Sequence, residues 1–234
     1  MTVLYSLKSA PSDLGQLSAE VTLMGGLAEA QVADAVASVE RRDVALAQAV
    51  IEKDARLDAM HRDIERKAIA LISSGSPDEA DLRRMLSAIK VSLDLQRTGR
   101  LARNIAKRAL SLAEGDPMTP MTRSIARMGR LVGGRLRDVL DAYTAGDVDL
   151  AIMVRDSDDE VDEHYNALFR ELLTYMMGDA RMIGACAHLL FMAKNLERIG
   201  DHATNIAETV HYSVTGAAMT AGRPRWESVT QGET

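Results

Sequence analysis

An internal repeat limits the fold of this 234-residue chain more than any other feature of its sequence. Three motifs of the first half return in the second half, in the same order. Residues 24–27 (Met-Gly-x-Leu) recur at 128–131, residues 43–47 (Asp-Val-x-Leu-Ala) at 147–151, and residues 95–106 (Leu-x-Arg-x-Gly-x-x-Ala-x-Asn-Ile-Ala) at 196–207. The shift is 104 residues for the first two motifs and 101 for the third. Self-similarity of this kind predicts two copies of one structural unit.

The apolar pattern indicates that each unit is helical. Only five residues are proline and 3% are aromatic, whereas 47% are hydrophobic, a composition that disfavours β-sandwiches and barrels. The long proline-free intervals carry apolar residues at three-to-four spacing, which is typical of helices that bury one face in a bundle. We therefore expect an all-α fold of two tandem antiparallel three-helix bundles. The expected helices span residues 13–41, 44–73, 78–114, 121–144, 147–177 and 180–213.

The segment 115–120 (Gly-Asp-Pro-Met-Thr-Pro) divides the two units, because no helix interior tolerates this combination of glycine and prolines. After residue 213 the sequence loses its periodicity and turns to Gly, Thr, Ser and Arg. We expect a first repeat over residues 10–115, a second repeat over 120–213 and a flexible C-terminal tail over 214–234.

The charge and the single cysteine disfavour several classes of function. The net charge of −6 disfavours nucleic-acid binding, because such a surface repels a phosphate backbone. Cys186 has no second cysteine for a disulfide, and residues 1–8 contain too short an apolar run for a signal peptide, so a cytoplasmic location is expected. No charge-free apolar stretch approaches the roughly 18 residues of a membrane span, so we expect no direct membrane insertion.

Each repeat carries an Asp-x-x-x-Asp pair on its middle helix: Asp54 with Asp58 and, 104 residues later, Asp158 with Asp162. Residues four apart share one helix face, where two like charges cost about 0.2–0.5 kcal/mol. Asp54 and Asp158 also fall in rows of apolar residues that face the bundle core, where an unpaired charge is costly. One such pair alone is typical of a solvated acidic face. Its recurrence in register favours a specific role.

The third helix of the second repeat adds Glu197 and Asp201, again four residues apart. Two helices then direct four carboxylates toward each other. At about 4 Å and an effective dielectric constant of about 20, each like-charged pair repels by roughly 4 kcal/mol, so cations are needed among them. An all-oxygen set suits Mg²⁺, Mn²⁺, Ca²⁺ or oxidised iron, and can bridge more than one ion. The predicted metal ligands are Asp158, Asp162, Glu197 and Asp201.

The first repeat differs at the corresponding positions, where Gln96 replaces Glu197 and Arg100 replaces Asp201. An amide and a guanidinium now face the two acids. A guanidinium neutralises a carboxylate without a metal. We expect an Asp54–Arg100 ion pair here, and therefore one bundle that binds metal and one that is closed by a salt bridge.

These residues resemble the PhoU family, the accessory proteins of the phosphate-specific transport system. The resemblance covers residues 10–213 and rests on residues 196–208 (Leu-Glu-Arg-Ile-Gly-Asp-His-Ala-Thr-Asn-Ile-Ala-Glu), the paired acid motifs and the duplicated three-helix frame. It implies a cytoplasmic regulator that is not an enzyme, restrains phosphate uptake when phosphate is ample and damps phosphate-starvation signalling. The implied partners are the ATPase of the phosphate ABC importer, a phosphate-sensing membrane histidine kinase and a second copy in a homodimer.

For the acidic residues, the resemblance implies a multinuclear iron or zinc cluster. The positions that match the family motif in the second repeat are Asp158, Asp162, Glu197 and Asp201. In the first repeat Asp54 and Asp58 match and form a second, weaker candidate for a metal site. Gln96 and Arg100 depart from the motif there.

Two other functions remain open on the sequence. In a metal-free helical adaptor, the acids would only keep a helix face soluble. A di-metal oxidase bundle needs two Glu-x-x-His pairs, and the sequence offers one, at Glu208 and His211.

Three further side chains are expected to be structural. His202 follows Asp201, but one step along a helix turns a side chain about 100° away from its neighbour, so we expect it outside the ligand set. His61 lies in a core-facing row and is expected to form a hydrogen bond there. Cys186 lies among apolar residues and is expected to be a buried, inert thiol.

Overall fold

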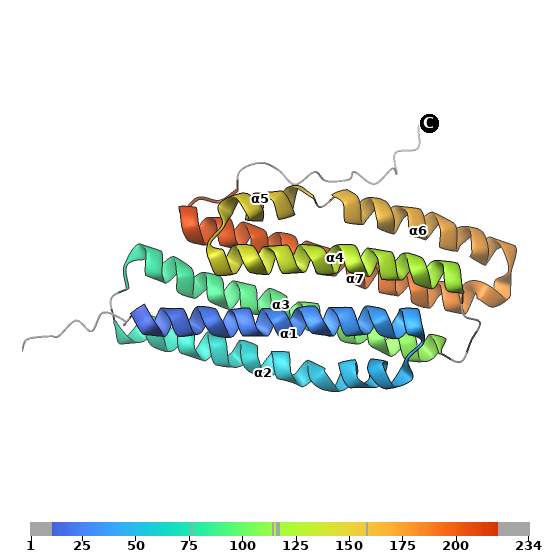
Figure 1. Ribbon diagram of the computed structural model, residues 1–234, viewed down its shortest axis with the longest axis horizontal. Coiled ribbons are helices and arrows are strands. Elements are labelled where there is room, and N and C mark those ends of the chain that lie inside the picture. The colour runs from blue at the N-terminus through green and yellow to red at the C-terminus, as the bar shows by residue number, and fades with distance from the viewer. Residues whose placement is uncertain (1–10, 76, 114, 116–117, 158, 220–234) are drawn as a thin grey trace, which may run out of the picture.

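The computed structural model describes residues 11–75, 77–113, 115, 118–157 and 159–219, and its regular structure within these ranges is entirely helical (Figure 1). The first bundle consists of α1 (Pro11–Arg41), α2 (Val44–Ser74) and α3 (Glu79–Leu112). The second consists of α4 (Thr119–Ala145), α5 (Val148–Asp156), α6 (Asp159–Gly178), the 3-10 helix η1 (Ala180–Met182) and α7 (Ile183–Thr215). The expected all-α fold of two tandem bundles is confirmed.

The repeated motif at residues 43–47 and 147–151 starts the middle helix of each bundle. The side chain of Asp43 accepts a hydrogen bond from the backbone N–H of Leu46 at 2.9 Å. Asp147 accepts the corresponding bond from Leu150 at 3.0 Å. An aspartate at this position satisfies an N–H group that a helix leaves unpaired in its first turn. The sequence repeat is therefore a repeat of helix caps.

The two bundles lie side by side, with α1 against α4 and α3 against α7 (Figure 1). The repeated Met-Gly-x-Leu motif lies in the α1–α4 contact. A Cβ atom on Gly25 would be 2.4 Å from Leu140, and a Cβ atom on Gly129 would be 2.4 Å from Val36. Both glycines are needed because the opposing side chain occupies the place of a Cβ. Leu140 is the repeat counterpart of Val36, so the contact has approximate twofold symmetry.

Helix α4 contains a glycine in close contact with α1, Gly129, and a glycine with open space around it, Gly133. Substituting them should have opposite effects on stability. In Gly129→Ala the new methyl group would overlap both Cγ atoms of the stiff Val36 side chain, so we expect the free energy of unfolding to fall by about 1–3 kcal/mol. Gly133 has open space at its Cβ position, and Gly133→Ala should raise the free energy of unfolding by about 0.5–1 kcal/mol. Urea denaturation measures both. Similar effects of the two substitutions would contradict the close α1–α4 contact.

The single helix expected over residues 147–177 is wrong, because the structure divides it into α5 and α6 (Figure 1). The carbonyl of Val154 accepts hydrogen bonds from Arg135 Nη2 at 2.8 Å and from Ser157 Oγ at 2.9 Å. Side-chain donors of this kind compete with the backbone for a helix carbonyl and bend or interrupt the helix. In the first bundle Lys53 occupies the repeat position of Ser157, and α2 is continuous.

The C-terminal end of the structure differs slightly from the expected tail. Helix α7 continues to Thr215 and is followed by Gly216 with φ +73°. Residues 220–234, most of the expected tail, lie outside the described residues. In the part of the chain that the structure describes, every helix is too short or too polar to cross a membrane.

Candidate functional site

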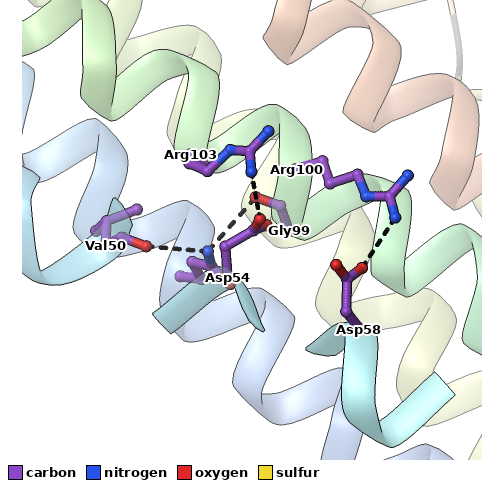
Figure 2. A network of polar contacts seen from close by, with 7 residues as sticks. Val50, Asp54, Asp58, Gly99, Arg100 and Arg103 are labelled. Atoms are coloured by element: carbon purple, nitrogen blue, oxygen red, sulfur yellow. Dashed lines mark hydrogen bonds and ion pairs between the residues drawn. The ribbon is translucent and has the colours of Figure 1, made fainter. Parts of the chain in front are cut away.

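Both acids of the first bundle are neutralised by arginines from α3 (Figure 2). Asp54 is 6% exposed, and its Oδ2 atom lies 2.6 Å from Arg103 Nη1. Asp58 is more exposed, and its Oδ1 atom lies 3.0 Å from Arg100 Nη2. The expected closure of the first bundle by a salt bridge between α2 and α3 is therefore confirmed.

The expected partner of Asp54 was wrong, because Arg100 pairs with Asp58 and Arg103 takes its place. The reason is the antiparallel arrangement of α2 and α3. Since the two helices run in opposite directions, the earlier acid meets the later arginine. The sequence contained this signal, because Arg103 lies one turn after Arg100.

Gln31 on α1 completes the polar interior of the first bundle. Its buried side-chain amide donates to the carbonyl of Val50 at 3.3 Å and to that of Gly99 at 3.4 Å. It therefore joins α1 to both other helices of its bundle. The sequence alone does not single out Gln31, because one glutamine in an amphipathic helix forms no pattern.

The second bundle carries its buried arginine on its first helix, whereas the first bundle carries Arg103 on its third. Arg135 on α4 is the repeat counterpart of Gln31 and is only 5% exposed. Its Nη2 atom donates to the Val154 carbonyl at 2.8 Å and to Thr204 Oγ1 at 3.2 Å. Thr204 in turn is the repeat counterpart of Arg103. One bundle thus has an amide on its first helix and a guanidinium on its third, and the other has a guanidinium on its first helix and a hydroxyl on its third.

Glu197 on α7 is a candidate ligand with a largely buried side chain, which is 16% exposed. Its Oε1 atom accepts from Lys194 Nζ at 2.8 Å, while its buried Oε2 atom has no hydrogen-bond partner among the described residues. Burial lowers the pKa of the Lys194 ammonium, but the hydrogen bond to Glu197 and the charges of Glu197 and Asp201 outweigh burial and raise that pKa above its ordinary value. The carboxylates of Glu197 and Asp201 therefore both stabilise the charged form of Lys194.

Helices α6 and α7 adjoin beside the other candidate ligands. A Cβ atom on Gly200 would be 3.6 Å from Val161, so the chain segments that carry Asp162 and Asp201 are in contact. Asp158 lies outside the described residues. Within the described ranges, no group of three or more His, Cys, Asp or Glu side chains is arranged to hold a metal ion.

The histidines have structural partners. His202 is 8% exposed, and its Nδ1 atom lies 2.8 Å from Oδ1 of the equally buried Asp94. This pair joins α7 to α3, and so connects the two bundles. His61 forms the expected hydrogen bond, with Ser92 Oγ at 2.9 Å.

Cys186 is fully buried, as expected. Burial raises the pKa of its thiol, because a thiolate is poorly solvated in an apolar interior. At neutral pH the thiol therefore stays protonated.

Comparison with known proteins gives the same family in both repeats. The PhoU domain model matches residues 21–109 and again residues 125–210. A Caulobacter vibrioides protein named phosphate-specific transport system accessory protein PhoU homolog is 59% identical over 97% of this chain and 99% of its own length. A Rhizobium meliloti protein of the same name is 43% identical over 96% of this chain and 95% of its own length.

Solved structures agree with this result. The crystal structure of PhoU from Pseudomonas aeruginosa has a TM-score of 0.83 at 38% identity and covers 88% of this chain and 99% of its own. The crystal structure of the phosphate transport system regulatory protein PhoU from Streptococcus pneumoniae has a TM-score of 0.81 at 27% identity, with 90% of this chain and 99% of its own covered. The similarity extends over both bundles in sequence and in structure. The chain therefore belongs to the PhoU family.

Proposed function

We propose that this chain is a cytoplasmic, non-catalytic regulator that restrains an ATP-driven phosphate importer when phosphate is ample. The observation that carries the proposal is similarity over nearly the whole chain to proteins named as accessory to phosphate-specific transport. Its partners in this role are the ATPase of the importer and a phosphate-sensing membrane histidine kinase, and it acts as a homodimer.

Deleting the gene in the source organism tests the regulatory role. In phosphate-rich medium, we expect the deletion strain to take up radiolabelled phosphate faster than the parent and to express its phosphate-starvation genes. Restoring the intact chain should reverse both effects. Unchanged uptake and expression in the deletion strain would count against the proposal.

We further propose that the second bundle holds hard metal ions on Asp158, Asp162, Glu197 and Asp201. The support is the buried Glu197 Oε2 atom, a carboxylate oxygen that has no donor among the described residues. Buried acceptors without a partner are rare in native proteins, and a bound cation would satisfy this one. The bound ion would supply positive charge; Lys194 holds the other oxygen of Glu197.

Metal loading is best tested with Glu197→Gln, which keeps the size of the side chain and removes its charge. We expect elemental analysis to find metal in the purified wild-type protein and to find less in the variant. Chelation should lower the melting temperature of the wild type, because a ligand that binds only the folded state stabilises it by mass action. Asp58→Asn in the closed first bundle is the matched control and should leave metal content unchanged.

A metal-free adaptor is the second candidate. Lys194 and the buried Arg135 favour it, since both bring positive charge to the second bundle without a metal, Lys194 at its surface and Arg135 in its interior. Equal metal content in the wild type and in Glu197→Gln, together with no effect of chelation, would support the adaptor over the metal site.

A further inference from the structure

A cavity of about 660 Å³ lies at one end of the molecule, between the two bundles. It is lined by the first turns of α1 and α3 and by the last turns of α4 and α7. In Figure 1 these four helix ends meet on the side where α1 begins. The cavity lies away from the carboxylates of both bundles, because its walls contain none of the candidate metal ligands.

Helix α3 places two unsatisfied hydrogen-bond donors in the wall of this cavity. Ser87 is 2% exposed, and its hydroxyl has no hydrogen-bond partner in the described part of the chain. Arg83 lies one turn earlier on the same face, and its buried Nε–H group likewise lacks a partner among the described residues. Buried donors normally have partners in native structures. Two of them side by side indicate an acceptor that the protein itself does not supply.

Arg83 is held in place before any ligand binds. Its guanidinium lies against Gly216, where a Cβ atom would be 3.3 Å from Arg83 Cζ. Gly216 has φ +73°, a conformation that favours glycine, so the bare backbone at this point leaves room for the guanidinium. A positioned guanidinium loses less conformational entropy on binding than a mobile one.

The charges around the cavity favour an anion. Arg83 and Arg84 both line it, and Asp81 is the acid in its wall. Arg83 also pairs with Glu79, but Glu79 is 88% exposed and such surface pairs are weak. The wall contains two helix N-termini and two C-termini, so the helix dipoles offset one another and the arginines decide the sign of the potential.

We propose that this cavity binds a small molecule with a phosphate group on an organic body of about nucleotide size. Guanidinium and hydroxyl donors suit phosphate oxygens. Ligand sites typically measure about 300–1,000 Å³, so the cavity of about 660 Å³ has room for more than inorganic phosphate. Tyr143 and Val214 in the wall give the organic body an apolar contact. The ligand contacts both bundles. The proposal goes beyond the regulatory role, and it is tested on the purified protein alone.

Isothermal titration calorimetry on the full chain tests the proposal with AMP, glucose 6-phosphate, inorganic phosphate and adenosine. We expect AMP or glucose 6-phosphate to bind more tightly than inorganic phosphate, and adenosine to bind weakly. Arg83→Gln should lower the affinity for the organic phosphate by about tenfold or more. This is the loss that follows from one missing charge-assisted hydrogen bond. Ser87→Val, which fills space next to Arg83, should weaken it as well.

The matched control is Arg97→Gln, which removes an exposed arginine of the same helix outside the cavity. It should leave affinity unchanged. Melting temperatures identify variants that fail to fold. Three results would overturn the proposal: no binding of either organic phosphate at millimolar concentration, equal binding of inorganic phosphate, or full affinity in both cavity variants.

Discussion

Replacing Arg103 by leucine should lower the free energy of unfolding by about 3 kcal/mol, because it leaves a charge buried without a partner. The Asp54 side chain is 9% exposed and its Oδ2 atom bonds to Arg103 at 2.6 Å. Its other oxygen, Oδ1, is buried and has no partner among the described residues, so Arg103 is its main compensation. Urea denaturation followed by circular dichroism measures the loss.

Two further variants separate the ion pair from other effects of losing Arg103. Arg100→Leu breaks the neighbouring Arg100–Asp58 pair, in which the arginine side chain is 49% exposed and the aspartate side chain 27%. Because such a pair is solvent-accessible, the substitution should lower the free energy of unfolding by less than about 1 kcal/mol. The double variant Asp54→Leu with Arg103→Leu removes both charges and should recover most of the loss, because an apolar pair can replace a buried ion pair. Equal losses in Arg103→Leu and Arg100→Leu would show that burial of Asp54 is unimportant.

Removing either partner of the Asp94–His202 pair should cost about 2 kcal/mol, because each leaves a buried polar group without its hydrogen bond. The two atoms are 2.8 Å apart, and each residue is 8% exposed. In a double-mutant cycle of Asp94→Ala and His202→Ala, the double variant should cost about 1 kcal/mol less than the two single variants together. The pair joins α3 to α7, so the cycle measures a contact between the bundles.

His188→Ala is the matched control, since His188 also lies on α7 and faces α3. Its ring nitrogen is 3.5 Å from Arg108 Nη1, at the limit of a hydrogen bond, so its removal should cost much less. Strict additivity of Asp94→Ala and His202→Ala would contradict the structure at this contact.

Local signals in the sequence predicted most of the fold. The internal repeat, with its shift of 104 residues, predicted two bundles. The apolar periodicity predicted most helix boundaries within a few residues of those observed. The interruption between α5 and α6 is not recorded in the apolar periodicity of residues 147–177. It coincides with Ser157, whose hydroxyl donates to the carbonyl of Val154, whereas Lys53 stands at this position in the continuous helix α2. Arg135 alone does not explain it, because its counterpart Gln31 donates to the carbonyl of Val50 without interrupting α2.

The candidate site was predicted less completely, because charges pair across helices. The residue types at the repeat positions predicted that an ion pair would close the first bundle. Because α2 and α3 are antiparallel, however, Asp54 pairs with Arg103 and not with Arg100. The sequence also contains a signal for Arg135. Its counterpart 104 residues earlier is the uncharged Gln31, so the second bundle carries an additional charge at this position. The metal ligands stay a prediction.

The twofold contact between α1 and α4 has an evolutionary consequence. Gly25 faces Leu140, and Leu140 stands where the first half has Val36. An ancestral half-chain would therefore have a self-complementary surface, with Gly25 of one copy against Val36 of the other, as in an isologous homodimer. Fusing two such copies removes the requirement that both halves remain identical. The two halves could then place an arginine differently, at position 103 on the third helix of the first half and at position 135 on the first helix of the second half. Neither change disturbs the surface that holds the halves together.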